Sequence, residues 1–330
     1  MKSVILDVDT GTDDAMALML AVAHPALDVR AVTCVGGNVS LEQVVANTLG
    51  ILELMGAGHI PVAAGLAEPL IEPAQDASYV HGSNGVADIE LPTPTRSVED
   101  VHAVELLRRT LAESTEPITI IALAPLGNIA LLLRLYPEVH AKIERIVFMG
   151  GAVGAGNATA SAEFNIWHDP EAAEMVLRSG VPTTMYGLEA FYQVTIDAET
   201  IGELASSTQP VQAVLGGLLS HLASISVDES RIVGAGWAAI GDAGTVCAVI
   251  DPDGLVLRTA PVEVSLAPGP TRGQTVVDLR TGLGAGGAET HEQESHIKVV
   301  LDVDGPRYAR LFLEAIDAVS SAAPATSPGE

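Results

Sequence analysis

The stretch VILDVDTGTDD, residues 4–14, decides the interpretation of the fold, because an apolar run passes directly into a dense group of carboxylates. The apolar residues 4–6 predict a buried strand, and the spacing of apolar residues that follows predicts a helix over about residues 13–23. Gly11 permits a sharp turn between the two elements. Because ligands bind outside the carboxyl ends of the strands in an open α/β sheet, these carboxylates mark a candidate site.

Outward from this stretch, short apolar runs alternate with helical patterns. The expected strands are residues 3–6, 29–35, 60–63, 118–123, 143–149, 182–186, 261–266, 275–279 and 297–303. The main helices expected between them lie at about residues 13–23, 41–55, 98–112 and 128–135, after Pro170, from Asp242 and from about Arg307. This alternation predicts an α/β fold with a single open, mostly parallel, doubly wound sheet and extra helices near the site. We expect one domain over residues 1–318 and a flexible tail over residues 319–330.

The composition restricts the classes of partner. The chain has 330 residues and a formal net charge of -26 at pH 7, so a polyanion such as nucleic acid meets an unfavourable field. No apolar run approaches about 18 residues without charge, Gly or Pro, which predicts no insertion into a membrane. Cys34 and Cys247 are the two cysteines, both within apolar stretches, and their scarcity favours a reducing, cytoplasmic setting.

Four carboxylates, those of Asp7, Asp9, Asp13 and Asp14, lie within the first stretch. A hard divalent cation such as calcium prefers about six to eight oxygen ligands, and its charge offsets the repulsion between clustered acids. In the alternative interpretation, Thr12 caps a helix and the two acids after it interact with the helix dipole. That alternative does not account for the two acids that precede the helix.

Two families share an Asp-x-Asp start. The haloacid-dehalogenase-like phosphatases need Thr or Val at the position of Gly11, so a magnesium phosphatase is the weaker match. The chain instead resembles the inosine-uridine-preferring nucleoside hydrolases, whose Asp-x-Asp-x-Gly-x-Asp-Asp signature matches residues 7–14. The resemblance continues in order at VGGN (35–38), HG (81–82), APLGN (124–128), MGG (149–151), EFN (163–165) and DPEA (169–172). The segment 187–241 lacks a clear counterpart.

This resemblance implies a Rossmann-like hydrolase that cuts the N-glycosidic bond of a small-molecule ribonucleoside to give ribose and free base, with Ca²⁺ as its cofactor. By the family pattern, the calcium ligands are the carboxylates of Asp9, Asp14 and Asp242 and the backbone carbonyl of Leu123. Asp9 is also implied as the general base toward a water bound to the metal, and His81 as a second catalytic residue. The implied substrate-binding residues are Asp13, Asn38, Met149, Asn157, Glu163 and Asn165. Because relatives are commonly dimers or tetramers, we expect a homodimer or homotetramer that acts in purine and pyrimidine salvage.

One position departs from the family. Many members carry His immediately before the late calcium-binding Asp, where it protonates the departing base, but this chain has Gly241. The activation of the leaving group therefore stays open among His81, solvent, and stacking of the base on Trp167 or Trp237. The same departure keeps a second function open, that of a nucleoside- or ribose-binding protein with little turnover. For Asn128, the favoured interpretation is a turn residue that bonds its own backbone.

Overall fold

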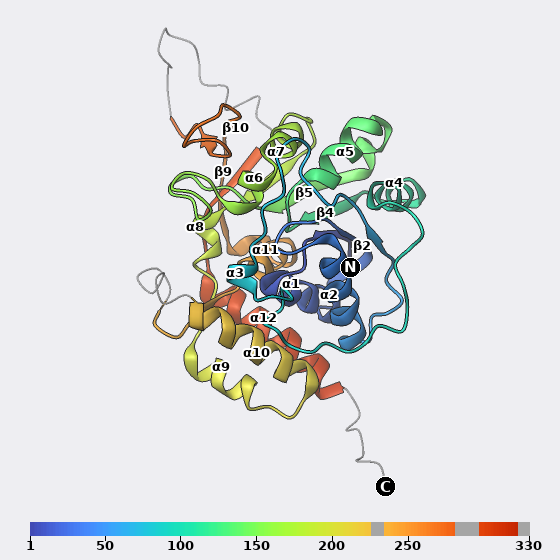
Figure 1. Cartoon of the computed structure of the whole chain (residues 1–330), viewed down its shortest axis with the longest axis vertical. Helices are drawn as coiled ribbons and strands as arrows, with labels where there is room; N and C mark the ends of the chain where they lie inside the picture. The colour runs from blue at the N-terminus through green and yellow to red at the C-terminus, as the bar shows by residue number, and fades with distance from the viewer. Residues whose placement is uncertain (226–233, 281–296, 323–330) are drawn as a thin grey trace.

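The computed structural model describes residues 1–225, 234–280 and 297–322, and its centre is an eight-stranded sheet in the order β3-β2-β1-β4-β5-β6-β12-β9 (Figure 1). Neighbouring strands are parallel, except that β9 runs antiparallel to β12. The strands are β1 (Lys2–Val8), β2 (Leu27–Cys34), β3 (Val62–Ala64), β4 (Ile118–Ala122), β5 (Ile143–Met149), β6 (Thr183–Tyr186), β9 (Leu255–Thr259) and β12 (Ile297–Val303). The prediction of one open, mostly parallel sheet is confirmed.

The strand order reverses at the centre of the sheet. β1 lies between β2 and β4 and pairs in parallel with both. The chain moves outward from β1 to β2 and β3, and then crosses back to begin the other half of the sheet at β4. In a doubly wound sheet, the loops after the strands on the two sides of such a reversal diverge and leave a crevice. The acidic loop after β1 and residue Leu123 after β4 border this crevice.

Helices cover both faces of the sheet (Figure 1). The helices packed with the first hydrophobic core are α1 (Thr12–Ala23), α2 (Leu41–Leu54), α11 (Gly241–Ile250) and α12 (Gly305–Ala322). The helices packed with the second are α4 (Ala103–Glu113), α5 (Gly127–Leu135) and α7 (Pro170–Leu177). Within β1, Val4, Leu6 and Val8 join the first core and Ile5 joins the second. This alternation follows because successive residues of a strand point to opposite faces.

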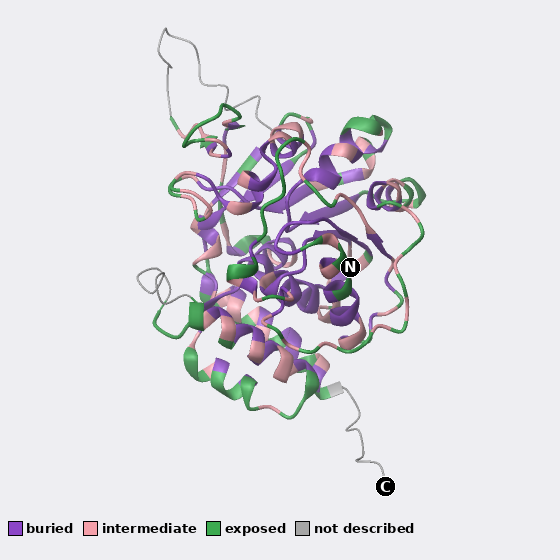
Figure 2. Cartoon of the chain, viewed as in Figure 1, coloured by how far each residue is buried: buried purple, intermediate pink, exposed green. Residues whose placement is uncertain are grey.

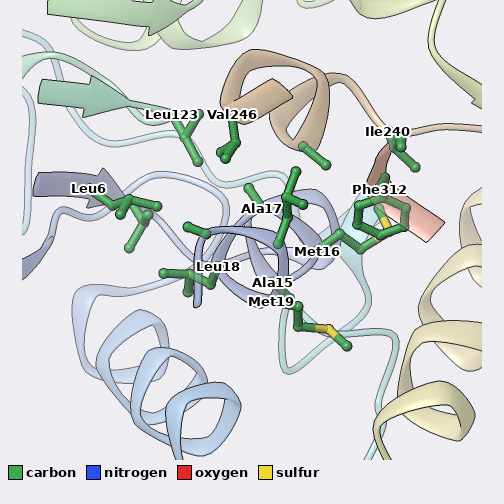
Figure 3. Packing of buried hydrophobic residues seen from close by; sticks show 14 of the residues in the cluster. Leu6, Ala15, Met16, Ala17, Leu18, Met19, Leu123, Ile240, Val246 and Phe312 are labelled. Atoms are coloured by element: carbon green, nitrogen blue, oxygen red, sulfur yellow. The ribbon is translucent and has the colours of Figure 1, made fainter. Parts of the chain in front are cut away.

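Helix α1 is apolar on all sides because it is enclosed. Its residues 14–21 are all buried, and α2, α11 and α12 pack against it. Figure 3 shows Met16 and Leu18 of α1 among Val246 of α11 and Phe312 of α12. A helix that is hydrophobic all round is stable only when it is surrounded. The packing therefore holds the acidic first turn of α1 in a defined place at the end of β1.

Short elements surround the crevice, as expected for extra helices near the site. Helices α3 (Ser78–His81), α6 (Phe164–His168), α8 (Leu188–Phe191) and α10 (Pro210–Ile225) contribute residues to it. Helix α9 (Ala198–Ala205) packs on α10 and is largely exposed (Figure 2). Two small antiparallel sheets pair β7 (Thr195–Ile196) with β8 (Ala238–Ala239) and β10 (Val262–Val264) with β11 (Thr275–Val277). Short 3₁₀ helices lie at η1 (Pro137–Lys142) and η2 (Pro252–Gly254).

The expectation for the last strands of the main sheet is wrong in part. The strands expected at residues 261–266 and 275–279 form the separate β10-β11 pair and do not complete the main sheet. The place beside β12 is taken by β9, an exposed edge strand that the sequence pattern did not predict. The chain leaves the main sheet at Pro261, and a proline cannot donate a hydrogen bond to a strand ladder.

Helix α12 continues to Ala322, so residues 319–322 of the expected flexible tail are helical. Residues 323–330, the rest of that tail, lie outside the described residues. Both cysteines are buried and unpaired, as their apolar surroundings predicted. Within the part of the chain that the structure describes, no helix is both long and apolar enough to cross a membrane.

Candidate active site

A cavity of about 420 Å³ opens at the crevice after β1, β4 and β5. This volume falls in the range of small-molecule sites, roughly 300–1,000 Å³. The predicted site residues that line the cavity are Asp13, Asn38, His81, Leu123, Met149, Asn157, Glu163, Asn165 and Asp242. The two remaining ones, Asp9 and Asp14, are buried behind the lining residue Asn38, which donates to both of them. All the predicted site residues thus meet in one place.

Three carboxylates from two helices converge there. One oxygen each of Asp13, Asp14 and Asp242 lies within 4.8 Å of the others. The first two belong to the first turn of α1 and the third to the first turn of α11, and these two helices pack together. Helix N-termini carry partial positive charge, which favours carboxylates at this position. Asp9, predicted as a ligand, is hydrogen-bonded to the same group because its backbone N–H donates to Oδ1 of Asp14 at 3.2 Å.

The side chain of Asp9 is only half satisfied. Its Oδ2 accepts the backbone N–H of Asn38 at 2.8 Å. A Cβ at Gly37 would lie 2.1 Å from that oxygen, so the close approach needs a glycine. Its Oδ1 is buried and has no hydrogen-bond partner among the described residues. A buried carboxylate oxygen without a partner is costly, which marks Oδ1 as the atom left for a ligand.

The negative charges of these carboxylates repel one another. Burial raises the pKa of Asp14 to about 7, and repulsion from Asp13 acts in the same direction. Burial and repulsion from neighbouring acids also raise the pKa of Asp9 and of Asp242 well above the usual range. Like the free oxygen of Asp9, Oδ1 of Asp242 is buried without a partner in the described ranges. Buried, unpartnered and mutually repelling oxygen donors fit a divalent cation, which would hold them in their charged forms.

The helix-capping interpretation of the acidic loop is partly right, although for a different residue. The N-cap of α1 is Gly11, and Thr12 is already helical. The cap is completed by Asp14, whose Oδ2 accepts the backbone N–H of Gly11 at 3.0 Å. One carboxylate therefore both closes the helix end and belongs to the acidic group.

Asp7 does not line the cavity, although its buried Oδ2, like Oδ1 of Asp9, has no hydrogen-bond partner among the described residues. Its Oδ1 accepts from Oγ1 of Thr33 at 2.5 Å and from Nδ2 of Asn128 at 2.9 Å. The same Nδ2 donates to the backbone carbonyl of Cys34, and Oδ1 of Asn128 accepts the N–H of Leu66. The interpretation of Asn128 as a turn residue bonded to its own backbone is therefore wrong. It is a buried amide that joins β1, β2 and the chain after β3.

The residues expected around the ribose are held by backbone contacts. Nδ2 of Asn165 donates to the carbonyl of Leu123 at 2.8 Å and to that of Met149 at 3.2 Å. Leu123 is a core residue that also lines the cavity. Both oxygens of Glu163 cap α6, and burial raises the pKa of this residue to about 7. Oδ1 of Asn157 accepts the N–H of Phe164 at 2.9 Å, just before these capped turns.

His81 lies beside the first turn of α1, at the end of α3, with its Nδ1 3.9 Å from Oδ1 of Asp13. Its Nδ1 lies 2.8 Å from Oγ1 of Thr12 and 3.3 Å from the backbone nitrogen of the same residue. Burial lowers the pKa of His81. A Cβ at Gly11 would lie 2.9 Å from Nδ1 of His81 and 2.7 Å from Nδ2 of Asn38. Gly11 stands at the expected turn between β1 and α1 with a φ of -96°, and its missing side chain leaves room for these two side chains.

The aromatic residues at the cavity differ from the expected ones. Neither Trp167 nor Trp237 lines it, and Trp237 is 41% exposed at the surface. The missed lining residues are Tyr79, Phe191, Tyr192, Leu222 and Ile225, from α3, the region of α8, and α10. Phe191 also explains Gly241, because a Cβ at 241 would lie 1.7 Å from Cδ2 of its ring. Most of these residues fall in the segment without a family counterpart, so no sequence signal identified them.

Comparisons with known proteins agree with this geometry. A family model described as inosine-uridine preferring nucleoside hydrolase matches residues 4–310. A pyrimidine-specific ribonucleoside hydrolase RihA from Escherichia coli O7:K1 is 38% identical over 317 residues, 95% of this chain and 97% of the relative. A purine-preferring ribonucleoside hydrolase from Gardnerella vaginalis superposes with a TM-score of 0.87 at 29% identity, over 98% of this chain and 100% of that one. A plant nucleoside hydrolase, PpNRh1, superposes with a TM-score of 0.88 at 30% identity, over 96% and 98%.

Proposed function

The chain belongs to the inosine-uridine preferring nucleoside hydrolase family, and on this premise we propose that it hydrolyses ribonucleosides to ribose and free base with calcium bound and with Asp9 as the general base. Family membership makes the chain a nucleoside hydrolase; the metal and the residue roles are the proposal. The observation that supports it best is the convergence of Asp13, Asp14 and Asp242, beside the half-satisfied Asp9, at one side of a cavity of suitable volume.

In this proposal, Ca²⁺ is held by the carboxylates of Asp9, Asp14 and Asp242 and by the backbone carbonyl of Leu123. The unpartnered Oδ1 atoms of Asp9 and Asp242 support this donor set. Asp13 belongs to the same cluster of oxygens, but its side chain is 17% exposed and lines the cavity, so we assign it to the ribose. When bound, the cation supplies positive charge that raises the acidity of the attacking water and orients the ribose.

Asp9 is suited to accept the proton of the water. Its Oδ2 accepts only the N–H of Asn38 and its Oδ1 has no partner among the described residues, so the carboxylate keeps lone pairs both for the cation and for a proton. As the water oxygen bonds to C1′, its proton passes to the carboxylate of Asp9 and the electron pair of the C1′–N bond leaves with the base. The base takes up a proton afterwards, which balances the reaction.

The ribose is proposed to lie against the polar side of the cavity. Asp13, Asn38 and Asn165 hydrogen-bond the 2′- and 3′-hydroxyls, which selects ribose over deoxyribose. Asn157 and Glu163 hold the 5′-hydroxyl. The sixth predicted binding residue, Met149, packs beside the sugar.

The base is proposed to lie at the apolar side of the cavity, toward Tyr79, Phe191 and Leu222. The relatives are named for pyrimidine as well as purine nucleosides, so both kinds of substrate belong in the test. Cytoplasmic location, a role in purine and pyrimidine salvage, and assembly as a homodimer or homotetramer are part of the same proposal.

A binding protein with little turnover is the second candidate, favoured by Phe191 occupying the place of an acid at Gly241. Incubation with inosine, uridine and a phosphate ester, followed by assays of free ribose and free phosphate, separates the possibilities. Ribose release that stops on chelation and returns with Ca²⁺ supports the hydrolase. Saturable binding of nucleoside without ribose release supports the binding protein, and phosphate release contradicts both.

A further inference from the structure

The contact between Thr12 and His81 determines which ring nitrogen of the histidine carries a proton. Both the hydroxyl and the backbone N–H of Thr12 point at Nδ1, at 2.8 Å and 3.3 Å. A backbone N–H can only donate, so Nδ1 must act as an acceptor. No other partner of the Thr12 hydroxyl occurs among the described residues, so its proton is available for the same nitrogen.

Among the residues that the structure describes, no carboxylate competes for a proton on Nδ1. Oδ1 of Asp13 lies 3.9 Å away, which exceeds hydrogen-bond distance. Nδ1 also faces the first turn of α1, whose partial positive charge opposes a proton on that nitrogen. The neutral ring therefore carries its proton on Nε2. That nitrogen has no hydrogen-bond partner in the described ranges, and the ring lines the cavity.

The opposite wall offers no donor at the position where many relatives have His. The ring of Phe191 fills the space that a side chain at 241 would need. Residue 241 therefore does not assist the departing base, and His81 is a lining side chain that can donate a proton or a hydrogen bond. Thr12 contacts Nδ1 of His81, so the ring proton is on Nε2, which has no hydrogen-bond partner among the described residues.

We infer that Thr12 is a positioning residue for departure of the base: it holds His81 in the tautomer whose Nε2–H donates a hydrogen bond to the leaving nucleobase. This inference rests on the proposed function. As the C1′–N bond breaks, its electron pair moves onto the base, and the Nε2–H bond stabilises that negative charge without losing its proton. The proton that the base finally acquires is the one that Asp9 took from water, returned through solvent.

The test compares Thr12→Val, which keeps the side-chain volume and loses the hydroxyl, with Thr12→Ser, which keeps the hydroxyl. Rates are measured on uridine, on inosine and on 4-nitrophenyl riboside, whose leaving group needs no assistance. Because Thr12→Val loses one hydrogen bond, it should lower kcat on the natural nucleosides by about three- to tenfold. It should retain most of the rate on the nitrophenyl riboside. Thr12→Ser should keep rates close to those of the wild type on all three substrates. Thr183→Val serves as a control, because Thr183 is a buried threonine whose hydroxyl bonds the carbonyl of Val181, at the start of β6. Its substrate ratio should equal that of the wild type.

Nitrogen-15 NMR of histidine-labelled, calcium-loaded protein gives a readout that does not depend on turnover. Nδ1 of His81 should show the shift of an unprotonated ring nitrogen and Nε2 that of a protonated one. A protonated Nδ1 in the wild type overturns the inference, as does an equal loss on all three substrates in Thr12→Val. If no riboside is hydrolysed by the wild type, the proposed function fails, and the NMR result still decides the tautomer.

Discussion

Gly241→Ala tests how closely the ring of Phe191 packs against the start of α11. The added Cβ would lie 1.7 Å from Cδ2 of Phe191 and 2.2 Å from two further ring carbons. Contacts this short cannot exist, so either the ring or the start of α11 must move. Overpacking of this kind costs roughly 1–3 kcal/mol. Replacing a helical glycine by alanine also stabilises the protein by about 0.4–1 kcal/mol, because the unfolded chain has less conformational entropy. We therefore expect the free energy of unfolding to fall by about 0.5–2 kcal/mol in total.

Gly202→Ala is the matched control. Gly202 is also a helical glycine, in α9, but a Cβ there would meet nothing within 4 Å. This variant should be stabilised by about 0.4–1 kcal/mol. The free energy of unfolding of both variants is measured by denaturant titration of calcium-loaded protein. Because Asp242 follows residue 241 directly, calcium affinity should fall in Gly241→Ala and stay unchanged in Gly202→Ala.

A double-mutant cycle identifies the ring as the cause. Phe191→Ala removes the ring and costs less than the roughly 3–5 kcal/mol of a fully buried phenylalanine, because Phe191 is half-buried. In that background, Gly241→Ala should lose its penalty, which gives a favourable coupling of about 1–3 kcal/mol. If Gly241→Ala is as stabilising as Gly202→Ala in the wild-type background, the ring moves aside freely and the reasoning is refuted. The same clash means that a histidine at 241 has no room unless Phe191 is also replaced.

Asp242→Asn should abolish calcium binding and ribose release together, whereas Asp28→Asn, at a half-buried acid in β2 that does not line the cavity, should leave both intact; full activity after exhaustive chelation would contradict the metal's role. Asp9→Asn should lower kcat by roughly 10²-fold or more on uridine and on 4-nitrophenyl riboside alike, because the base acts on the water; near-normal turnover would show that Asp9 is not the base. Burial raises the pKa of Asp7 to about 7 from 3.8, so the folded protein binds a proton that the unfolded chain has lost. Stability from this group is therefore present below pH 4 and is lost as the pH rises to about 7, by up to about 1.4 kcal/mol per pH unit. Asp7→Asn should flatten that slope, and an unchanged slope of unfolding free energy against pH would show that Asp7 titrates normally.

The alternation of apolar runs and helical patterns was sufficient to predict the architecture of the sheet. Strands such as β1 are buried on both faces, so their side chains read as continuous apolar runs that are local in the sequence. The acidic loop was recognisable for the same reason, since Asp9, Asp13 and Asp14 lie within a few residues of each other. The edge strand β9 was missed because its apolar run, residues 255–257, is shorter than the roughly four to eight residues typical of a strand.

Contacts between distant residues were decided only by the tertiary structure. Asp242 reaches Asp14 because α11 packs against α1, and the sequence alone suggested this pairing only through family resemblance. The role of Asn128 and the aromatic wall at Phe191 had no local pattern at all. Gly11 and Gly241 illustrate the difference most clearly. The sequence determines that these residues have no side chain, but the side chains that fill the vacant space come from elements far away in the chain. Periodicity records which face of an element is buried, whereas the identity of the neighbour depends on how whole elements pack.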